Sequence, residues 1–132
     1  IEGSRYFSHK LGLNPDEPIY GIHRIRYGNR EPLAIEYTYL PLKFFPDIAG
    51  YNFERVSLYG YMASKNHLPC NFRETMTMMS ADRKMSSHLR LTDENIVNHI
   101  EIFGYDSSGN LVEYTESYSR PDRLEVRFVT SR

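Results

Sequence analysis

The chain has 132 residues, 40% hydrophobic and 25% charged, which fits one globular domain with a single hydrophobic core. It carries 16 Lys+Arg against 17 Asp+Glu, a formal net charge of −1, which argues against a DNA-binding surface within it. The sequence has no apolar run of roughly 20 residues and no signal-peptide pattern, which predicts a cytoplasmic protein with no membrane contact. Cys70 is the single cysteine, so no internal disulfide is expected.

The first part of the chain predicts a short helix followed by a β-hairpin. Residues 5–12 carry Phe7 and Leu11 at helical spacing. Residues 18–27 alternate as a strand, Gly28–Asn29 is a turn signal, and residues 33–40 form the return strand. A loop with one helical turn is expected at 41–48.

The middle of the chain has a different pattern. Ser57 precedes apolar residues at helical spacing, which predicts a capped helix that ends near Asn66. Residues 69–79 predict a long strand with Phe72, Met76 and Met78 on one face. The methionines are expected to fill core space, as flexible apolar side chains commonly do.

The last part of the chain repeats the first. The apolar spacing that begins at Phe7 recurs from Met85, a strand is predicted at 95–105, and a turn follows at 107–110. Glu113-Tyr114-Thr115 repeats Glu36-Tyr37-Thr38, and residues 123–129 predict a last strand. The alternative is chance similarity between two hairpins. A true duplication predicts an α+β fold, with a mostly antiparallel sheet, helices packed on one side of it and a pseudo-twofold axis.

Arg24 and Arg26 are the clearest candidate binding residues. Two positions apart on a strand, they project from the same face and could hold a phosphate or carboxylate group. Glu36 lies across the predicted hairpin, where it could orient both guanidiniums or accept hydrogen bonds from ligand hydroxyls. A surface ladder of cross-strand ion pairs, of little functional weight, is an equally open interpretation.

The repeat bears on this choice. By sequence offset, Arg24 and Arg26 correspond to Ile102 and Gly104, whereas Glu113 retains the acid of Glu36. Because a ladder needed only for sheet stability has less reason to differ between the halves, the missing arginines favour a binding role.

The start of the middle helix is a weaker candidate. A helix N-terminus at Ser57 could bind an anion, but Ser57 is interpreted first as the cap of its own helix. Tyr59 could face solvent, core or ligand.

No catalytic or metal-binding pattern is found. The five histidines show no metal-ligand spacing with Cys70, and there is no Gly-rich phosphate loop, nucleophile elbow or pair of acids. Asp106 and Glu116 are interpreted as solvated charges near turns. The sequence therefore predicts no catalytic residue, no metal and no cofactor.

Several short motifs together resemble a known family. They are Leu11-Gly12-Leu13, Pro18-Ile19-Tyr20, His23 to Arg26, Glu31 to Glu36, Tyr39-Leu40-Pro41, Phe45-Pro46-Asp47, Ser57-Leu58-Tyr59, Ala81-Asp82 with Leu89, and Asp106, Gly109, Val112 to Tyr114, Arg120 and Asp122-Arg123. In this order they resemble the effector-binding (UTRA) domain of the HutC branch of GntR-type bacterial transcription regulators, whose fold is related to that of chorismate lyase.

The resemblance implies a single effector-binding domain over residues 1–132. The DNA would be contacted only by an N-terminal winged helix-turn-helix domain outside this chain, and the start at Ile1 agrees with a fragment. The effector would be a phosphorylated sugar or another small anion, and the domain would form a homodimer that represses or activates transcription. The effector contacts implied are Arg24, Arg26, Glu36, Ser57, Tyr59 and Glu113.

Two points separate the chain from the usual family pattern. Ser119 stands where the family often has tyrosine, and Arg120-Pro121-Asp122 replaces Arg-Gly-Asp. The alternative function is an enzyme of chorismate-lyase type, which is disfavoured because no residue is placed as an obvious acid, base or nucleophile.

Overall fold

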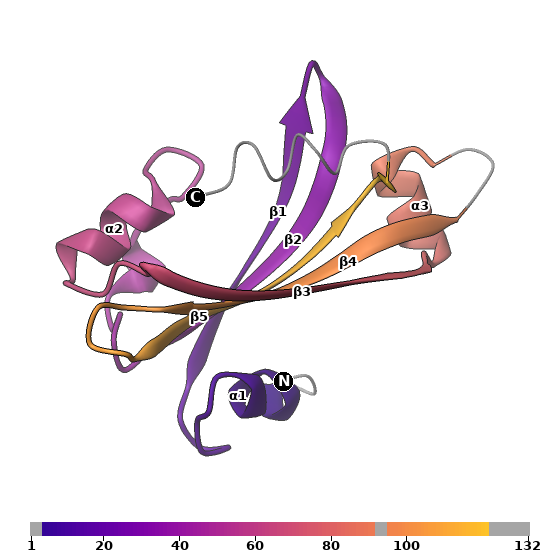
Figure 1. Ribbon diagram of the computed structural model, residues 1–132. Coiled ribbons are helices and arrows are strands. Elements are labelled where there is room, and N and C mark those ends of the chain that lie inside the picture. The colour runs from indigo at the N-terminus through magenta and orange to yellow at the C-terminus, as the bar shows by residue number, and fades with distance from the viewer. Residues whose placement is uncertain (1–3, 92–94, 122–132) are drawn as a thin grey trace.

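An antiparallel five-stranded sheet forms the centre of this α+β domain (Figure 1). The computed structural model describes residues 4–91 and 95–121, and the strand expected at 123–129 lies outside them. The sheet order is β1-β2-β5-β4-β3. Along the chain the elements are α1 (Ser4–Lys10), β1 (Ile19–Gly28), β2 (Glu31–Pro41), the 3-10 helix η1 (Ile48–Gly50), α2 (Leu58–Ser64), β3 (Asn71–Ser80), α3 (Arg83–Leu89), β4 (Ile96–Tyr105) and β5 (Leu111–Ser119).

The turn of the first hairpin is one residue later than expected. Asn29 and Arg30 have φ values of 52° and 66°. Positive φ at both central residues is the backbone of a type I′ turn, whose twist matches that of the two strands. The strands on either side then pair so that Arg24 lies opposite Glu36.

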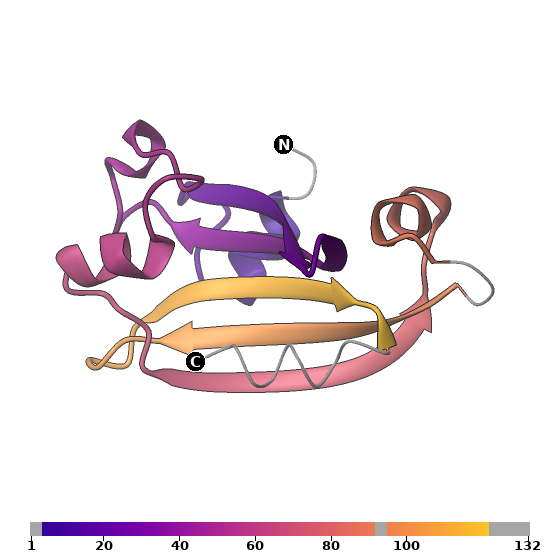
Figure 2. The same cartoon turned by 90° about the horizontal axis from the view of Figure 1, so that it is seen from above.

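The repeat seen in the sequence is confirmed by the sheet. The two hairpins, β1–β2 and β4–β5, lie side by side through the β2–β5 pairing (Figure 2). Thr38 and Thr115, the third members of the repeated strings, face each other in this pairing, with 2.9 Å between their Oγ1 atoms. The pseudo-twofold axis therefore passes through this buried threonine pair. β3 adds a further strand beside β4.

The helices do not all pack on one side of the sheet, so this part of the prediction was wrong. α1 and α3 cover one face, through clusters that include Tyr114 and Leu89 respectively. α2 covers the opposite face, where Met62 packs with Leu40. The reason is the alternation of β2, which presents buried Ile35 to the first face and buried Leu40 to the second, so that both faces need a cover.

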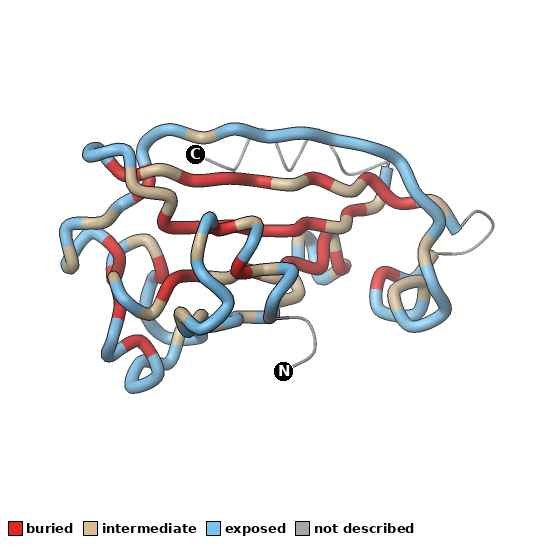
Figure 3. The backbone as a smooth tube through the Cα atoms, turned by 90° about the horizontal axis from the view of Figure 1, so that it is seen from below, coloured by how far each residue is buried: buried red, intermediate tan, exposed pale blue. Residues whose placement is uncertain are grey.

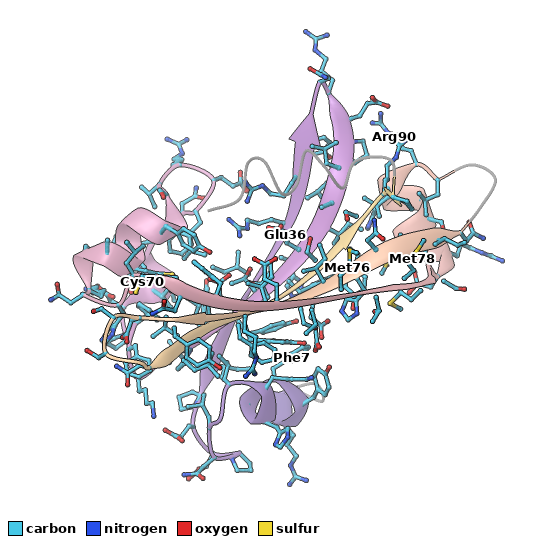
Figure 4. All side chains as sticks on the ribbon, in the orientation of Figure 1. Phe7, Glu36, Cys70, Met76, Met78 and Arg90 are labelled. Carbon is cyan, nitrogen blue, oxygen red and sulfur yellow. The ribbon has the colours of Figure 1, made fainter. Side chains whose placement is uncertain are left out.

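The methionines of β3 also depart from expectation. Met76, Met78 and Met79 are 46%, 62% and 40% exposed and do not fill the core. Among the described strands β3 is the outermost beside β4, and its backbone forms the long exposed edge in Figure 3. Figure 4 shows Met76 and Met78 along this strand. Position at the sheet edge, which a local apolar pattern does not reveal, leaves them uncovered.

Asp106 is not the solvated charge that its place near a turn indicated. It is 2% exposed and organises the β4–β5 turn. Its carboxylate accepts hydrogen bonds from the backbone N–H of Ser108 and from the backbone and side-chain N–H groups of Asn110. It also contacts His67 Nδ1 at 2.8 Å. Burial alone would raise the pKa of Asp106, but these contacts outweigh it and lower the pKa to about 2.

Glu116 was likewise expected to be solvated and is buried. Its carboxylate accepts hydrogen bonds from Tyr114 at 2.7 Å and Tyr118 at 3.0 Å on the face covered by α1 and α3. In both cases the donors come from the folded chain, which replaces water around the charge.

The carboxyl of Asp106 makes stability depend on pH. Because its pKa falls from 3.8 in the unfolded chain to about 2 in the fold, its contribution is complete above about pH 4 and disappears as the pH falls toward 2. We predict that Asp106→Asn lowers the free energy of unfolding at pH 7 by about 1.5–3 kcal/mol. Urea unfolding at pH 7 and pH 2.5, with exposed Asp16→Asn as control, measures it. An equal loss at both pH values would contradict the assignment.

Candidate functional site

A cavity of about 1190 Å³ opens on the sheet face that α2 covers. Its wall on one side is the β1–β2 hairpin, its floor includes β4 and β5 residues, and its other wall is the segment from Tyr51 to Tyr59. Figure 1 shows α2 and this segment beside the hairpin. All the residues that the sequence singled out line this one cavity: Arg24, Arg26, Glu36, Ser57, Tyr59 and Glu113.

The cationic wall is built on one buried carboxylate. Glu36, whose side chain is only 8% exposed, lies on the opposite side of the sheet from Phe7 (Figure 4). Arg24 Nη2 and Arg26 Nη1 both lie 3.6 Å from the same oxygen, Oε1. Ser117 Oγ donates a long hydrogen bond of 3.5 Å to Oε2. One carboxylate therefore holds two guanidiniums at the cavity wall.

The two arginines retain donors for a further acceptor. Each guanidinium has five N–H donors in a fixed geometry, more than one shared oxygen can satisfy. Arg24 Nε is buried and has no acceptor among the described residues. The Arg24 side chain is 29% exposed and that of Arg26 55%. The shared acid is buried and both arginines line the cavity, which favours a binding role over a surface ladder.

The floor of the cavity is a chain of hydroxyl contacts. Glu113 accepts from Tyr59 at 2.9 Å through Oε1 and from Thr115 at 2.6 Å through Oε2. Because Thr115 has one hydroxyl proton and gives it to Glu113, its contact with Thr38 requires Thr38 to be the donor. Sequence reasoning did not select these threonines as site residues, although the repeated Glu-Tyr-Thr string contains both.

Pairing in the sheet corrects the comparison between the two halves. Arg24 lies opposite Glu36, and the residue opposite Glu113 is Gly104, not the Ile102 expected from the sequence offset. A Cβ at Gly104 would lie 3.1 Å from both Glu113 Oε1 and Pro69 Cβ. A side chain there would require a neighbour to shift by a few tenths of an ångström. Hydroxyls surround Glu113 where arginines surround Glu36.

Ser57 caps its helix, as its first interpretation held. Its Oγ accepts from the backbone N–H of Gly60 at 3.0 Å. By fixing the start of α2, it places Tyr59 against Glu113. The segment before it, with Tyr51 and Phe53 on the cavity wall, gave no sequence signal for a site.

The described part of the chain, residues 4–91 and 95–121, contains no group of three His, Cys, Asp or Glu residues that could hold a metal ion. Across those same residues, no helix has the length and apolar character needed to span a bilayer.

Comparisons with known proteins agree on one family. Residues 4–125 match the sequence profile of the family described as the UTRA domain. The mannosyl-D-glycerate transport/metabolism system repressor MngR of Escherichia coli K12 is 20% identical over the whole chain, which covers 55% of MngR. The E. coli K12 HTH-type transcriptional regulator GgaR is 26% identical over 86% of the chain and 44% of its own length. The chain thus spans about half of these relatives.

A solved structure supports the same fold. The effector domain of PhnF from Mycobacterium smegmatis superposes with a TM-score of 0.81 at 19% identity, covering 89% of this chain and 73% of that one. Identity at this level shows a shared architecture.

The hydroxyl chain of the floor predicts unequal effects of two similar substitutions. Thr115→Val removes a donor from buried Glu113 and the acceptor from Thr38, whereas Thr38→Val removes only a donor to Thr115. We predict a loss of about 1–3 kcal/mol in unfolding free energy for Thr115→Val and a smaller loss for Thr38→Val. Denaturant unfolding of both variants measures this difference, and a larger loss for Thr38→Val would reverse the donor assignment.

Proposed function

The chain belongs to the UTRA domain family, and from this premise we propose that it is the effector-sensing domain of a bacterial transcription regulator. Its relatives MngR and GgaR are named a repressor and a transcriptional regulator. Since the chain spans about half of each, we assign the DNA contact to a domain outside it. The formal net charge of −1 supports this division, because binding to DNA draws on a basic surface.

The observation that carries the proposal is the pair of arginines held by Glu36 in the cavity. Guanidiniums with donors to spare fit the planar oxygens of a phosphate or carboxylate. Glu113, an acceptor beside the arginine wall in the same cavity, suits hydroxyl groups of a ligand. We therefore propose a small anionic effector with hydroxyls, such as a phosphorylated sugar or a hydroxy-carboxylate, contacted by Arg24, Arg26, Glu36, Tyr59 and Glu113.

Ser57 has two parts in this proposal. Its side-chain oxygen accepts from Gly60 and so holds the start of α2 at the cavity. The Ser57 hydroxyl keeps its own proton and lines the cavity, so Ser57 stays in the proposal as a further donor to the effector. A chorismate-lyase-type enzyme is not proposed, because the UTRA domain is a regulatory ligand-binding domain and the relatives are regulators by name.

The arginine wall predicts the effect of one substitution. We predict that Arg26→Ala weakens binding of glucose 6-phosphate at least tenfold, about 1.4 kcal/mol, while the melting temperature hardly changes because Arg26 is half exposed. Calorimetric titration measures the affinity. Arg55→Ala is the matched control, since it removes the same charge from an exposed position outside the cavity lining.

Two results would count against this role. Equal losses in both variants would indicate a general charge effect. Unchanged affinity in Arg26→Ala would indicate that Arg24, Arg26 and Glu36 form only a ladder of ion pairs.

We further propose that the domain forms a homodimer. The chain has 11 Tyr and 7 Phe, residue types enriched in interface cores, and β3 exposes Met76 and Met78 on an outer strand. Light scattering at high micromolar concentration is expected to give twice the 15.5 kDa chain mass. Met76→Lys with Met78→Lys is expected to weaken the dimer, and a monomer for the unaltered chain would contradict it.

A further inference from the structure

The cavity extends beyond its arginine wall to a second region lined by aromatic rings. We propose that Tyr51 and Phe53 form a carbohydrate subsite, so that the effector is a phosphorylated disaccharide with its phosphate at Arg24 and Arg26 and its second sugar ring on these aromatics. This inference rests on the proposed function, because it names the substrate class of that same cavity.

The first support is size. Pockets for small ligands commonly have volumes of about 300–1,000 Å³, and this cavity has about 1190 Å³. Its lining runs from the arginines on β1 to Tyr51 and Phe53 on the segment before α2. This volume is larger than a single sugar phosphate needs.

The second support is the state of the rings. Tyr51 is 43% exposed, although burying such a ring is favourable. The Tyr51 and Phe53 rings are nearly parallel, at 22° with centroids 6.3 Å apart. Both pack on buried Tyr61, with centroid distances of 4.6 Å and 5.6 Å. Tyr61 is itself fixed by its hydroxyl, which donates to Asp47. The packing on Tyr61 therefore holds both rings in position.

The backbone of this segment is also held in place before any ligand binds. Tyr51 N–H donates to Ile48 at 3.1 Å. The Asn52 side chain accepts from Glu54 N–H at 2.9 Å, and the Asn52 carbonyl accepts from the N–H groups of Arg55 and Val56 at 3.0 Å. A wall ordered in advance lowers the entropy lost on binding.

The polar groups among the rings indicate a sugar. Asn52 and Glu54 alternate with the aromatics and line the same cavity. A sugar ring offers a flat face of C–H groups to an aromatic ring and hydroxyl donors at its edge to carboxylates. A wholly apolar ligand would desolvate Glu54 without giving it a hydrogen bond, which is costly.

Calorimetry with a graded set of probes tests the subsite. The probes are inorganic phosphate, glucose 6-phosphate, maltose 6′-phosphate, cellobiose 6′-phosphate, uncharged maltose and cellobiose, and AMP. We expect a disaccharide phosphate to bind at least tenfold more tightly than glucose 6-phosphate. Tyr51→Ala should remove this gain and leave glucose 6-phosphate affinity within twofold, whereas Tyr51→Phe, which keeps the ring, should retain the gain. Tyr6→Ala, at an exposed tyrosine of α1 on the opposite face, is the control and should change neither affinity.

Each outcome bears on one of the two proposals. Glucose 6-phosphate binding with no gain for either disaccharide phosphate, or a gain that survives Tyr51→Ala, overturns the subsite and leaves the proposed anion site standing. Maltose or cellobiose binding that depends on Tyr51, without any phosphate effect, supports the subsite and overturns the anion site. Tighter binding of AMP than of both disaccharide phosphates overturns the sugar assignment, and failure of all probes overturns both proposals.

Discussion

The burial of a carboxylate on each half of one sheet face is the constraint that shapes the cavity. Glu36 and Glu113 occupy corresponding positions of the repeat, and both are less than a tenth exposed. A buried charge is tolerated only when it is paired or hydrogen-bonded. Arg24 and Arg26 form ion pairs with Glu36, while Tyr59 and other hydroxyls donate hydrogen bonds to Glu113. The same requirement, met in two ways, makes the two halves of the cavity chemically different.

This asymmetry gives the cavity of a duplicated fold two chemically different sides. The β2–β5 pairing joins the hairpins, with the threonine pair on the pseudo-twofold axis, and Gly104 places no side chain opposite Glu113. The cavity wall on β1 then carries the guanidinium donors of Arg24 and Arg26, and its floor carries the carboxylate acceptor of Glu113. α2 and the segment before it close the remaining side, with Tyr51 and Phe53 on the cavity wall. A ligand with an anionic end, hydroxyls and a flat face matches all three regions.

Features that depend on local pattern were predictable from the sequence. Alternation and the repeated Glu-Tyr-Thr string indicated the hairpins, the pseudo-twofold and the meeting of Arg24 with Glu36. Features set by contacts between distant segments were not: the side on which α2 packs, the outer position of β3, the burial of Asp106 and the rings of Tyr51 and Phe53. Each depends on which distant strand or turn packs beside it. The spacing of residue types along the chain predicts local elements and does not identify those neighbours.

The central claim is that the Arg24 guanidinium, whose Nε has no acceptor among residues 4–91 and 95–121, completes its hydrogen bonds with the anion of an effector. Nuclear magnetic resonance of the arginine side-chain N–H groups, with Arg24→Lys to assign the Nε signal, observes this directly. On titration with glucose 6-phosphate the account predicts that the Arg24 Nε–H signal shifts and saturates, and that uncharged glucose leaves it in place. An Arg24 Nε–H signal that stays in place while the sugar phosphate binds would contradict the claim. So would the absence of any binding at millimolar sugar phosphate.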